Sequence, residues 1–378
     1  MMASTTTAGS RGHFNFKSLN SVLKNSSKNR WNTPAVIGTN LSQSRASFAA
    51  RCSSSTQIQD ANSSREKKGG RQFPDFLPDS YLAEIEETAC LDMAASMRRV
   101  NLTPNWEGEA QPVPTSVVST QHVADDHAPV VMLHGFDSSC LEFRRIMPLL
   151  EERRIEAHAV DLVGWGFTDA GAAPGVGPEQ KRAHLEAFWR EELNGRPITL
   201  LGCSLGGAVA IDFALSVPEA VKALVLVDAQ GFIDGLGAMA SMPQWAAKLG
   251  VSVLKAVPLR NAANKMAYAN KDLFATEDAM RVGRLHCHMP NWLDNNVSYM
   301  QSGGYSLSSS IPKLAELTET HVFWGAQDEI LEPETADKFR NAISNATVTM
   351  VDDCGHVAHL EQPIVLADRL DAIVRNKA

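Results

Sequence analysis

Short apolar runs alternate with amphipathic segments along the chain from about residue 128 onward. The apolar runs lie at 130–133, 157–160, 198–201, 223–227, 322–324 and 348–351. The segments between them with helical periodicity lie at 141–153, 180–193, 205–215 and 333–343. Runs that are apolar throughout indicate strands buried on both faces, which is typical of a parallel sheet between helices. The pattern predicts an α/β fold with a doubly wound, mostly parallel sheet. Its active-site groups should lie at the carboxyl ends of the strands.

One long interval interrupts this alternation. Between Asp228 and His321 lie roughly 90 residues without a strand pattern, too many for an unstructured loop. The interval is rich in helix-forming residues and in Met. It predicts a helical cap inserted at 231–310, which divides the core into 114–230 and 311–378. Most of these Met side chains should form the core of the cap, and some can line a pocket because Met is flexible and polarisable.

A further helix is expected before the core. Apolar residues recur at helical spacing from Leu82 to Met97, and the opposite side carries acidic residues. We interpret residues 73–113 as an N-terminal helix and loop extension that packs on the core.

Charge separates the first residues from the rest. Residues 1–72 contain 11 Lys and Arg but two Asp and Glu, whereas residues 73–378 contain 24 and 41. The first 72 residues are also rich in Ser, so we predict a disordered segment of the transit-peptide type, removed near Cys52. A chloroplast is the expected destination, with the mitochondrion as the alternative. A disordered tail without a targeting role is the simpler interpretation.

Composition excludes several classes of protein. The net charge of −8 argues against nucleic acid as the main partner. No apolar run is long enough for a transmembrane helix, although peripheral membrane contact stays possible. The six Cys residues form no C-x-x-C pair, and we interpret the His and Cys residues at 286–288 as packing. No dinucleotide or phosphate motif is present, so no cofactor and no metal are predicted. The expected partner is a small hydrophobic molecule, and the oligomeric state is left open.

The sequence Gly-Cys-Ser-Leu-Gly-Gly at 202–207 is the strongest chemical signal. It follows the strand predicted at 198–201 and precedes a helix. A Ser on a sharp strand-to-helix turn projects its hydroxyl above the sheet, and small neighbours make room for that turn. Ser204 is therefore the candidate nucleophile. The backbone amide of Leu205, at the helix N-terminus, is a candidate oxyanion donor.

Two further loops follow predicted strands. In the His-Gly-Phe sequence at 134–136, the backbone amide of Phe136 is the candidate second oxyanion donor. We interpret His134 as a residue that orients this loop rather than as a base. In the loop 161–169, Asp161 should bind loop backbone, and Trp165 can form a wall of the pocket.

The candidate base and acid follow the last two strands. His356 lies after the strand at 348–351, and an imidazole can accept and return the Ser proton. His359 is its competitor, interpreted as packing. Asp328 follows the strand at 322–324 and is the candidate acid that orients His356. Asp228 is the rival acid.

Residues from about 128 to 378 resemble the α/β-hydrolase superfamily in its cap-bearing, esterase- and lipase-like branch. The matching blocks lie at 134–136, 161–169, 202–207, 325–328 and 355–356. With its N-terminus, the chain looks like a plant chloroplast α/β-hydrolase. Epoxide hydrolases and dehalogenases of this superfamily carry Asp at the nucleophile position, so Ser204 argues against those activities. The family begins with an antiparallel hairpin, and the segment before His134 predicts a shortened one.

The resemblance implies a serine hydrolase that cleaves a hydrophobic ester, lipid-like or a small acyl ester, through an acyl-enzyme. Acyl transfer or carbon–carbon bond hydrolysis would use the same residues. The alternative of another class is a non-catalytic ligand receptor or scaffold, because plants also use this fold for hormone perception.

Overall fold

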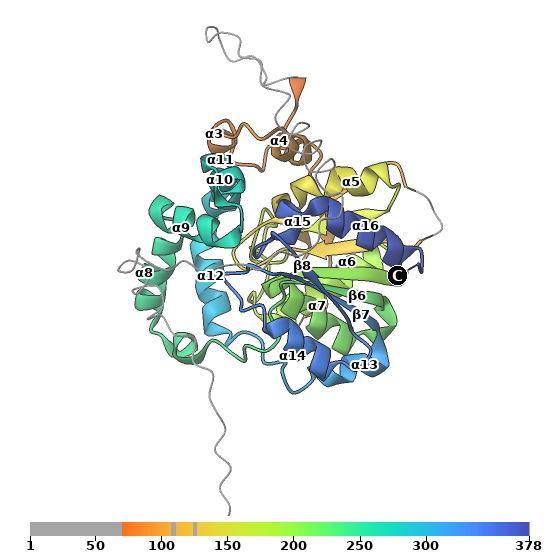
Figure 1. Cartoon of the computed structure of the whole chain (residues 1–378). Coiled ribbons are helices and arrows are strands. Elements are labelled where there is room, and N and C mark those ends of the chain that lie inside the picture. The colour runs from red at the N-terminus through yellow and green to blue at the C-terminus, as the bar shows by residue number, and fades with distance from the viewer. Residues whose placement is uncertain (1–69, 107–110, 124–126, 378) are drawn as a thin grey trace, which may run out of the picture. The chain divides into compact units, whose positions relative to one another are not determined.

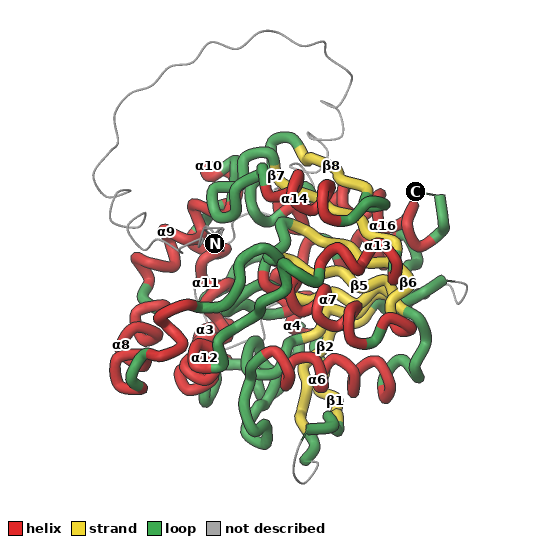
Figure 2. Tube along the Cα trace, turned by 90° about the horizontal axis from the view of Figure 1, so that it is seen from below, coloured by secondary structure: helices red, strands yellow, loops and turns green. Residues whose placement is uncertain are grey.

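The computed structural model describes residues 70–106, 111–123 and 127–377, and its backbone centres on one twisted sheet (Figures 1 and 2). The strands are β1 Arg98–Leu102, β2 Val113–Ser119, β3 Val130–Leu133, β4 Ala157–Val160, β5 Ile198–Cys203, β6 Val221–Val227, β7 Glu319–Gly325 and β8 Thr347–Val351. Their order is β1-β2-β4-β3-β5-β6-β7-β8. β2 pairs antiparallel with β1 and β4, and all other neighbours are parallel. The predicted α/β class and mostly parallel sheet are confirmed.

Helices cover both faces of this sheet. The core helices are α5 Met147–Glu152, α6 Pro178–Glu191, α7 Leu205–Ser216, α13 Leu314–Leu317, α14 Thr335–Ala342, α15 Ala358–Glu361 and α16 Pro363–Val374, with 3-10 turns at η2 Cys140–Arg145, η3 Pro218–Ala220 and η6 Ile311–Lys313. Along β3, Val131 and Leu133 pack into one apolar cluster, whereas Val130 and Met132 pack into the other. This alternation gives the sheet a separate core on each side, which explains why a central strand such as β3 is apolar throughout.

The interval between β6 and β7 folds into helices. They are η4 Gly237–Ser241, α8 Gln244–Leu254, α9 Val257–Ala267, α10 Lys271–Phe274, α11 Glu277–Arg284, η5 Leu285–His288 and α12 Trp292–Gln301. These elements form a layer beside one end of the sheet (Figure 1). His356 follows β8 and donates its backbone N–H to the carbonyl of Ala267 in α9 at 2.8 Å, which places this layer at the carboxyl ends of the strands.

The segment before the core differs from its sequence-based expectation in two respects. Residues 98–102, which we expected in a helix and loop extension, form β1 and complete the hairpin with β2. Only Val100 and Leu102 of this strand are buried, so its apolar signal is too short to stand out.

The expected helix from Leu82 to Met97 is also divided, into α3 Asp79–Leu82 and α4 Thr88–Ala95. The break occurs because the backbone N–H groups of Glu86 and Glu87 donate to the carboxylate of Asp278 in α11, at 3.0 and 2.6 Å.

The Glu87 carboxylate fixes this extended piece to the core. It accepts hydrogen bonds from Arg144 and Arg145 of η2 at 2.7 and 2.8 Å. The segment from Ala83 to Glu87 therefore joins the cap to the core.

Among the described residues, no helix has both the length and the apolar character needed to cross a bilayer. The predicted targeting segment 1–72 lies, except for its last three residues, outside the described residues.

Candidate active site

Ser204 lies on a strained turn between β5 and α7. Its φ of 50° and ψ of −119° are unusual for a residue with a side chain, and such strain is common at functional sites. The turn is held because Ser204 N–H donates to the carbonyl of Val227 at 3.0 Å. A Cβ on Gly206 would lie 2.3 Å from the carbonyl oxygen of Leu133, so only Gly allows this approach to β3. These contacts explain the small residues around Ser204.

The loop after β3 packs directly against Ser204. A Cβ on Gly135 would lie 3.3 Å from Cβ of Ser204 and 3.8 Å from its Oγ. Phe136 is the next residue, so its backbone amide belongs to the part of this loop that packs beside the candidate nucleophile. Leu205 is the first residue of α7, and the first N–H groups of a helix have no acceptor inside it. The two backbone amides proposed for the oxyanion hole thus come from segments that meet at Ser204.

Glu142 supports this loop from behind, a role the sequence analysis missed. Its carboxylate accepts from the N–H of Gly135 at 3.2 Å and from Oγ of Ser138 at 2.5 Å. Burial raises the pKa of Glu142 to about 7, although these hydrogen bonds oppose the shift. The sequence offered only the short separation of seven residues between Gly135 and Glu142 as a signal. It did not predict the contact, because Glu142 lies in the 3-10 turn η2 and not in a regular helix.

His356 and Asp328 meet at the ends of β8 and β7. Nδ1 of His356 lies 2.7 Å from Oδ2 of Asp328. The other oxygen of Asp328 accepts from the backbone N–H groups of Ile330 and Leu331 at 2.7 and 3.0 Å, which fixes the carboxylate. Burial favours the neutral ring, but the hydrogen bond and charge of Asp328 outweigh it, so the pKa of His356 is raised. The pair has the geometry of a histidine oriented by an acid.

Asp228, the alternative candidate for the acid, contacts backbone, whereas Asp328 contacts the ring of His356. It is fully buried, and its Oδ1 accepts from the N–H of Gly325 at 2.7 Å. Burial raises the pKa of Asp228 to about 7, with the charge of His356 opposing the shift. Asp228 is therefore near His356, yet it holds the backbone at the end of β7 while Asp328 holds the ring.

Within the described part of the chain, Ser204 forms no hydrogen bond with either candidate histidine. Catalytic hydrogen bonds commonly tighten only when substrate is bound. The structure thus brings together the acid and base, and separately the nucleophile and the oxyanion loop.

His359 packs beneath the nucleophile turn. Its Nδ1 lies 3.4 Å from Sγ of Cys203, and its Nε2 lies 3.5 Å from the carboxylate of Glu142. Burial lowers the pKa of His359 to about 3, so the ring is neutral. These contacts are those of a packed core histidine.

His134 and Asp161 both hold backbone. Nε2 of His134 accepts from the N–H of Leu162 at 3.2 Å, which leaves Nδ1 to donate to the carbonyl of Gly135 at 2.9 Å. Asp161 accepts from the N–H groups of Cys140 and Phe167 at 2.6 and 2.8 Å. Together they join the loop after β3 to the loop after β4.

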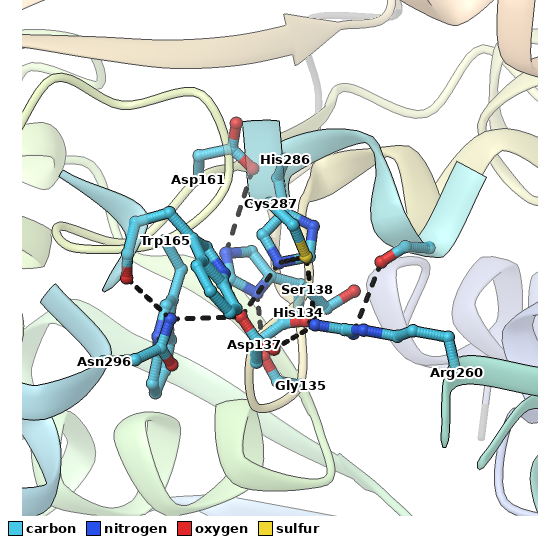
Figure 3. Close-up of polar contacts among 12 residues, drawn as sticks. His134, Gly135, Asp137, Ser138, Asp161, Trp165, Arg260, His286, Cys287 and Asn296 are labelled. Atoms are coloured by element: carbon cyan, nitrogen blue, oxygen red, sulfur yellow. Dashed lines mark hydrogen bonds and ion pairs between the residues drawn. The ribbon is translucent and has the colours of Figure 1, made fainter. Parts of the chain in front are cut away.

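Asp137 connects the same loop to the cap (Figure 3). It follows Phe136 in a left-handed conformation, with φ of 48°, and it is buried. Its Oδ1 accepts from Nε2 of His286 at 3.0 Å and from Nε1 of Trp292 at 2.7 Å, and its Oδ2 forms an ion pair with Arg260. Side chains from α9, η5 and α12 therefore converge on one carboxylate of the candidate oxyanion loop.

The charges of this cluster suit its burial. Burial alone would raise the pKa of Asp137, but Arg260 and His286 outweigh it and lower the value to about 2. Burial alone would lower the pKa of His286, but its contacts with Cys287 and Asp137 raise it to about 10. At neutral pH a buried carboxylate thus faces two cations, which makes this junction of cap and loop strongly electrostatic.

Two groups of side chains among the described residues are close enough to share a metal ion. They are Asp137, His286 and Cys287, and Glu142, Cys203 and His359. In the first group, Nη2 of Arg260 pairs with Asp137 and lies 3.0 Å from Sγ of Cys287. The guanidinium of Arg260 thus supplies the positive charge that a metal ion would bring to this group.

A polar surface cleft lies apart from these residues. It measures about 340 Å³ and is lined by the loop 174–177, by α12 and by single residues of α6 and α8, and neither Ser204 nor His356 lines it. The cleft therefore does not belong to the candidate site.

Comparisons with known proteins agree with the fold. Residues 130–369 match the alpha/beta hydrolase family. The chain belongs to this family. It is 37% identical over 299 residues to the alpha/beta hydrolase domain-containing protein VTE7 of Arabidopsis thaliana, covering 79% of this hydrolase and 89% of the relative.

More distant relatives differ in their reactions. A 2-hydroxy-6-oxononadienedioate/2-hydroxy-6-oxononatrienedioate hydrolase of Klebsiella pneumoniae is 27% identical over 258 residues, covering 67% of this chain and 87% of the relative. Among solved structures, an esterase from Thermogutta terrifontis has a TM-score of 0.61 at 18% identity, covering 74% of this chain and 99% of that one. The likeness to the esterase shows the fold of this hydrolase.

Proposed function

We propose that this hydrolase cleaves a hydrophobic carboxylic ester with Ser204, His356 and Asp328 as its catalytic groups. The observation that carries the proposal is the 2.7 Å contact between Nδ1 of His356 and Asp328 at the strand ends. This contact leaves Nε2 of His356 as the ring nitrogen that can accept a proton. A strained Ser204 on the neighbouring turn supplies the nucleophile.

The reaction then runs in two steps. Oγ of Ser204 attacks the ester carbonyl carbon while Nε2 of His356 takes the Ser proton, and the N–H groups of Phe136 and Leu205 bind the oxyanion. Collapse of the tetrahedral intermediate releases the alcohol, which receives the proton from His356. Water, deprotonated by the same nitrogen, attacks the acyl carbon. The second tetrahedral intermediate then releases the acid as Oγ of Ser204 takes the proton back from His356. Asp328 stabilises the imidazolium in both steps.

Aromatic side chains support an apolar substrate. Phe136 is 43% exposed although it lies in the loop beside Ser204. Its ring meets Trp165 edge-on, with centroids 5.4 Å apart, and lies 6.0 Å from Tyr299 of α12. Trp165 and Tyr299 are buried beneath Phe136. The ring of Phe136 is therefore the exposed apolar surface beside Ser204, and it favours acyl or prenyl chains over charged groups.

The same region argues for an ester over a carbon–carbon hydrolase substrate. The substrate in the name of the Klebsiella relative is a dioate, with two carboxylates that need cations. Arg260 and His286, the two cap cations described at the loop beside Ser204, already pair with Asp137. A neutral ester leaves these ion pairs intact.

An alkyl fluorophosphonate, which labels activated serines, tests the proposal. We expect labelling of the wild-type chain and none of Ser204→Ala, together with faster hydrolysis of p-nitrophenyl esters as the acyl chain lengthens. A folded wild-type chain that resists the probe would instead support a non-catalytic receptor. Faster cleavage of a dienoic dicarboxylate than of any ester would favour carbon–carbon hydrolysis.

We further propose that the protein acts in the chloroplast. The support is the basic, Ser-rich composition of residues 1–72. N-terminal sequencing of the protein from plant tissue should find a start near Cys52, and an intact Met1 would contradict import.

A further inference from the structure

Helix α8 exposes an apolar stripe to solvent. Trp245, Leu249 and Val253 are 74%, 65% and 52% exposed, and Val257 at the start of α9 is 41% exposed. The first three residues are four apart, so they lie on one face of α8. Single exposed apolar residues are ordinary, but a contiguous row containing Trp marks a contact surface.

The orientation of α8 is fixed by its other face. Ala247 and Val251 are buried in a cluster with Trp292 and Val297 of α12. Rotating the helix to cover the stripe would expose this cluster. The stripe therefore faces away from this cluster as a stable feature of the fold. Helix α8 itself lies at the outer side of the cap layer (Figure 1).

Charge differs sharply between cap and core. The cap, residues 231–310, holds seven Lys and Arg and five Asp and Glu, whereas the rest of 73–378 holds 17 and 36. Between Asp234 and Asp272 five basic residues and no acidic residue occur. Three of the five, Lys248, Arg260 and Lys271, form ion pairs with acidic residues elsewhere. The remaining two, Lys255 and Lys265, are exposed and lie on either side of Val257 in the sequence.

We propose that this stripe docks the hydrolase onto an anionic lipid bilayer. Trp and aliphatic side chains flanked by Lys suit the interfacial region of a membrane, where the apolar groups enter and the ammonium groups meet lipid phosphates. The strongly acidic core is repelled by the same surface, so electrostatics orients the cap toward the lipid.

Other occupants fit the charges less well. A second copy of the chain would bring Lys255 and Lys265 of one cap against those of the other. The segment 1–72 of the same chain is itself strongly basic. An anionic bilayer is the occupant with complementary charge.

Docking would serve the proposed reaction, and this consequence rests on the proposed function. Helix α9, which continues the stripe, also carries Arg260 to Asp137 beside Phe136. A lipid surface held against α8 and α9 thus lies on the part of the cap that contacts the candidate oxyanion loop. An ester dissolved in the bilayer would meet the enzyme there.

A fluorophore on the stripe reports docking independently of catalysis. In the full chain with Cys52→Ser, an environment-sensitive dye is attached at Ser252→Cys, between Leu249 and Val253; the other five Cys residues are buried. With phosphatidylcholine vesicles containing 30% phosphatidylglycerol, we expect a blue shift that pure phosphatidylcholine reduces and 0.5 M NaCl weakens. The same dye at Ser344→Cys, an exposed core position, should not respond.

A matched pair of variants assigns the binding. Trp245→Gln with Leu249→Gln and Val253→Gln should lower the vesicle partition coefficient at least tenfold and leave hydrolysis of a soluble short-chain ester within twofold. The control Met350→Gln with Val365→Gln changes exposed apolar residues of the core and should bind as wild type.

Three results would overturn the proposal. They are undiminished vesicle binding by the triple variant, equal dye shifts at both positions, and a wild-type dimer that the triple variant dissociates without any vesicle binding. The two proposals fail separately. A wild-type chain that hydrolyses the soluble ester but does not bind vesicles contradicts docking alone, and one that binds vesicles but hydrolyses no ester contradicts the proposed function alone.

Discussion

Asp328 holds His356 from a neighbouring strand end, with Oδ2 and Nδ1 2.7 Å apart. Because Asp328 is itself fixed by two backbone N–H groups, the ring has one orientation. Asp328→Asn should keep the fold and lower kcat about 10²- to 10⁴-fold, because the amide no longer stabilises the imidazolium. Steady-state kinetics and circular dichroism test this. Asp228→Asn is the control, and a larger loss of kcat in that variant would reassign the acid.

The raised pKa of His356 predicts the pH dependence of the reaction. The base must be neutral, so kcat/KM should rise with pH through the raised value and fall off toward acid at a higher pH than an ordinary histidine, near 6.5, would give. In Asp328→Asn the acid limb should move to lower pH, because the stabilising charge is lost. A profile from pH 5 to 9 measures both, and an unmoved limb would show that His356 is not the titrating base.

The Asp137 cluster predicts a coupled effect on stability and rate. Asp137→Asn leaves Arg260 and His286 without their counter-charge in a buried place, which should cost about 3–5 kcal/mol of unfolding free energy. The loop that contains Phe136 should also become less well ordered, so the fold-decrease in kcat should be larger than the fold-increase in KM. Urea unfolding and ester kinetics test the two parts. Asp169→Asn, in a more exposed loop, is a charge-matched control that should change neither.

Glu142 should act through the loop it supports. Glu142→Ala removes the acceptor of the Gly135 N–H and should lower kcat about tenfold by displacing the Phe136 amide, with little change in KM. Glu142→Gln keeps an acceptor oxygen and should restore most of the rate. Equal losses in both variants would mean that the charge of Glu142, not its hydrogen bonds, is what matters.

Sequence patterns predicted the sheet well because its parallel strands each contain a short apolar run, and amphipathic segments separate most of these runs. The cap was predicted from the length of an interval without strands. β1 was missed because its buried residues are only Val100 and Leu102. The helix from Leu82 to Met97 was overestimated because its interruption depends on Asp278, almost 200 residues away.

The candidate site shows the same limit. Ser204, Asp328 and His356 could be named because each follows a strand, and parallel strands end at a common edge. Asp137 also follows a strand, but nothing in the sequence marks its role, and Glu142 lies further on, in the 3-10 turn η2. The importance of Asp137 comes from Arg260, His286 and Trp292, whose spacing from it, 123 to 155 residues, reflects only the way the cap folds back.

The short segment containing Glu86 and Glu87 limits how far the chain can be shortened from its N-terminal side without loss of stability. Its backbone N–H groups donate to Asp278 of the cap, and the Glu87 carboxylate accepts hydrogen bonds from Arg144 and Arg145 of the core. Removal of residues up to about Cys52 would leave these contacts intact, whereas a cut beyond Ala83 would weaken one connection between the cap and the core. A version of the chain beginning at β1 should therefore be less stable than one beginning at Arg71.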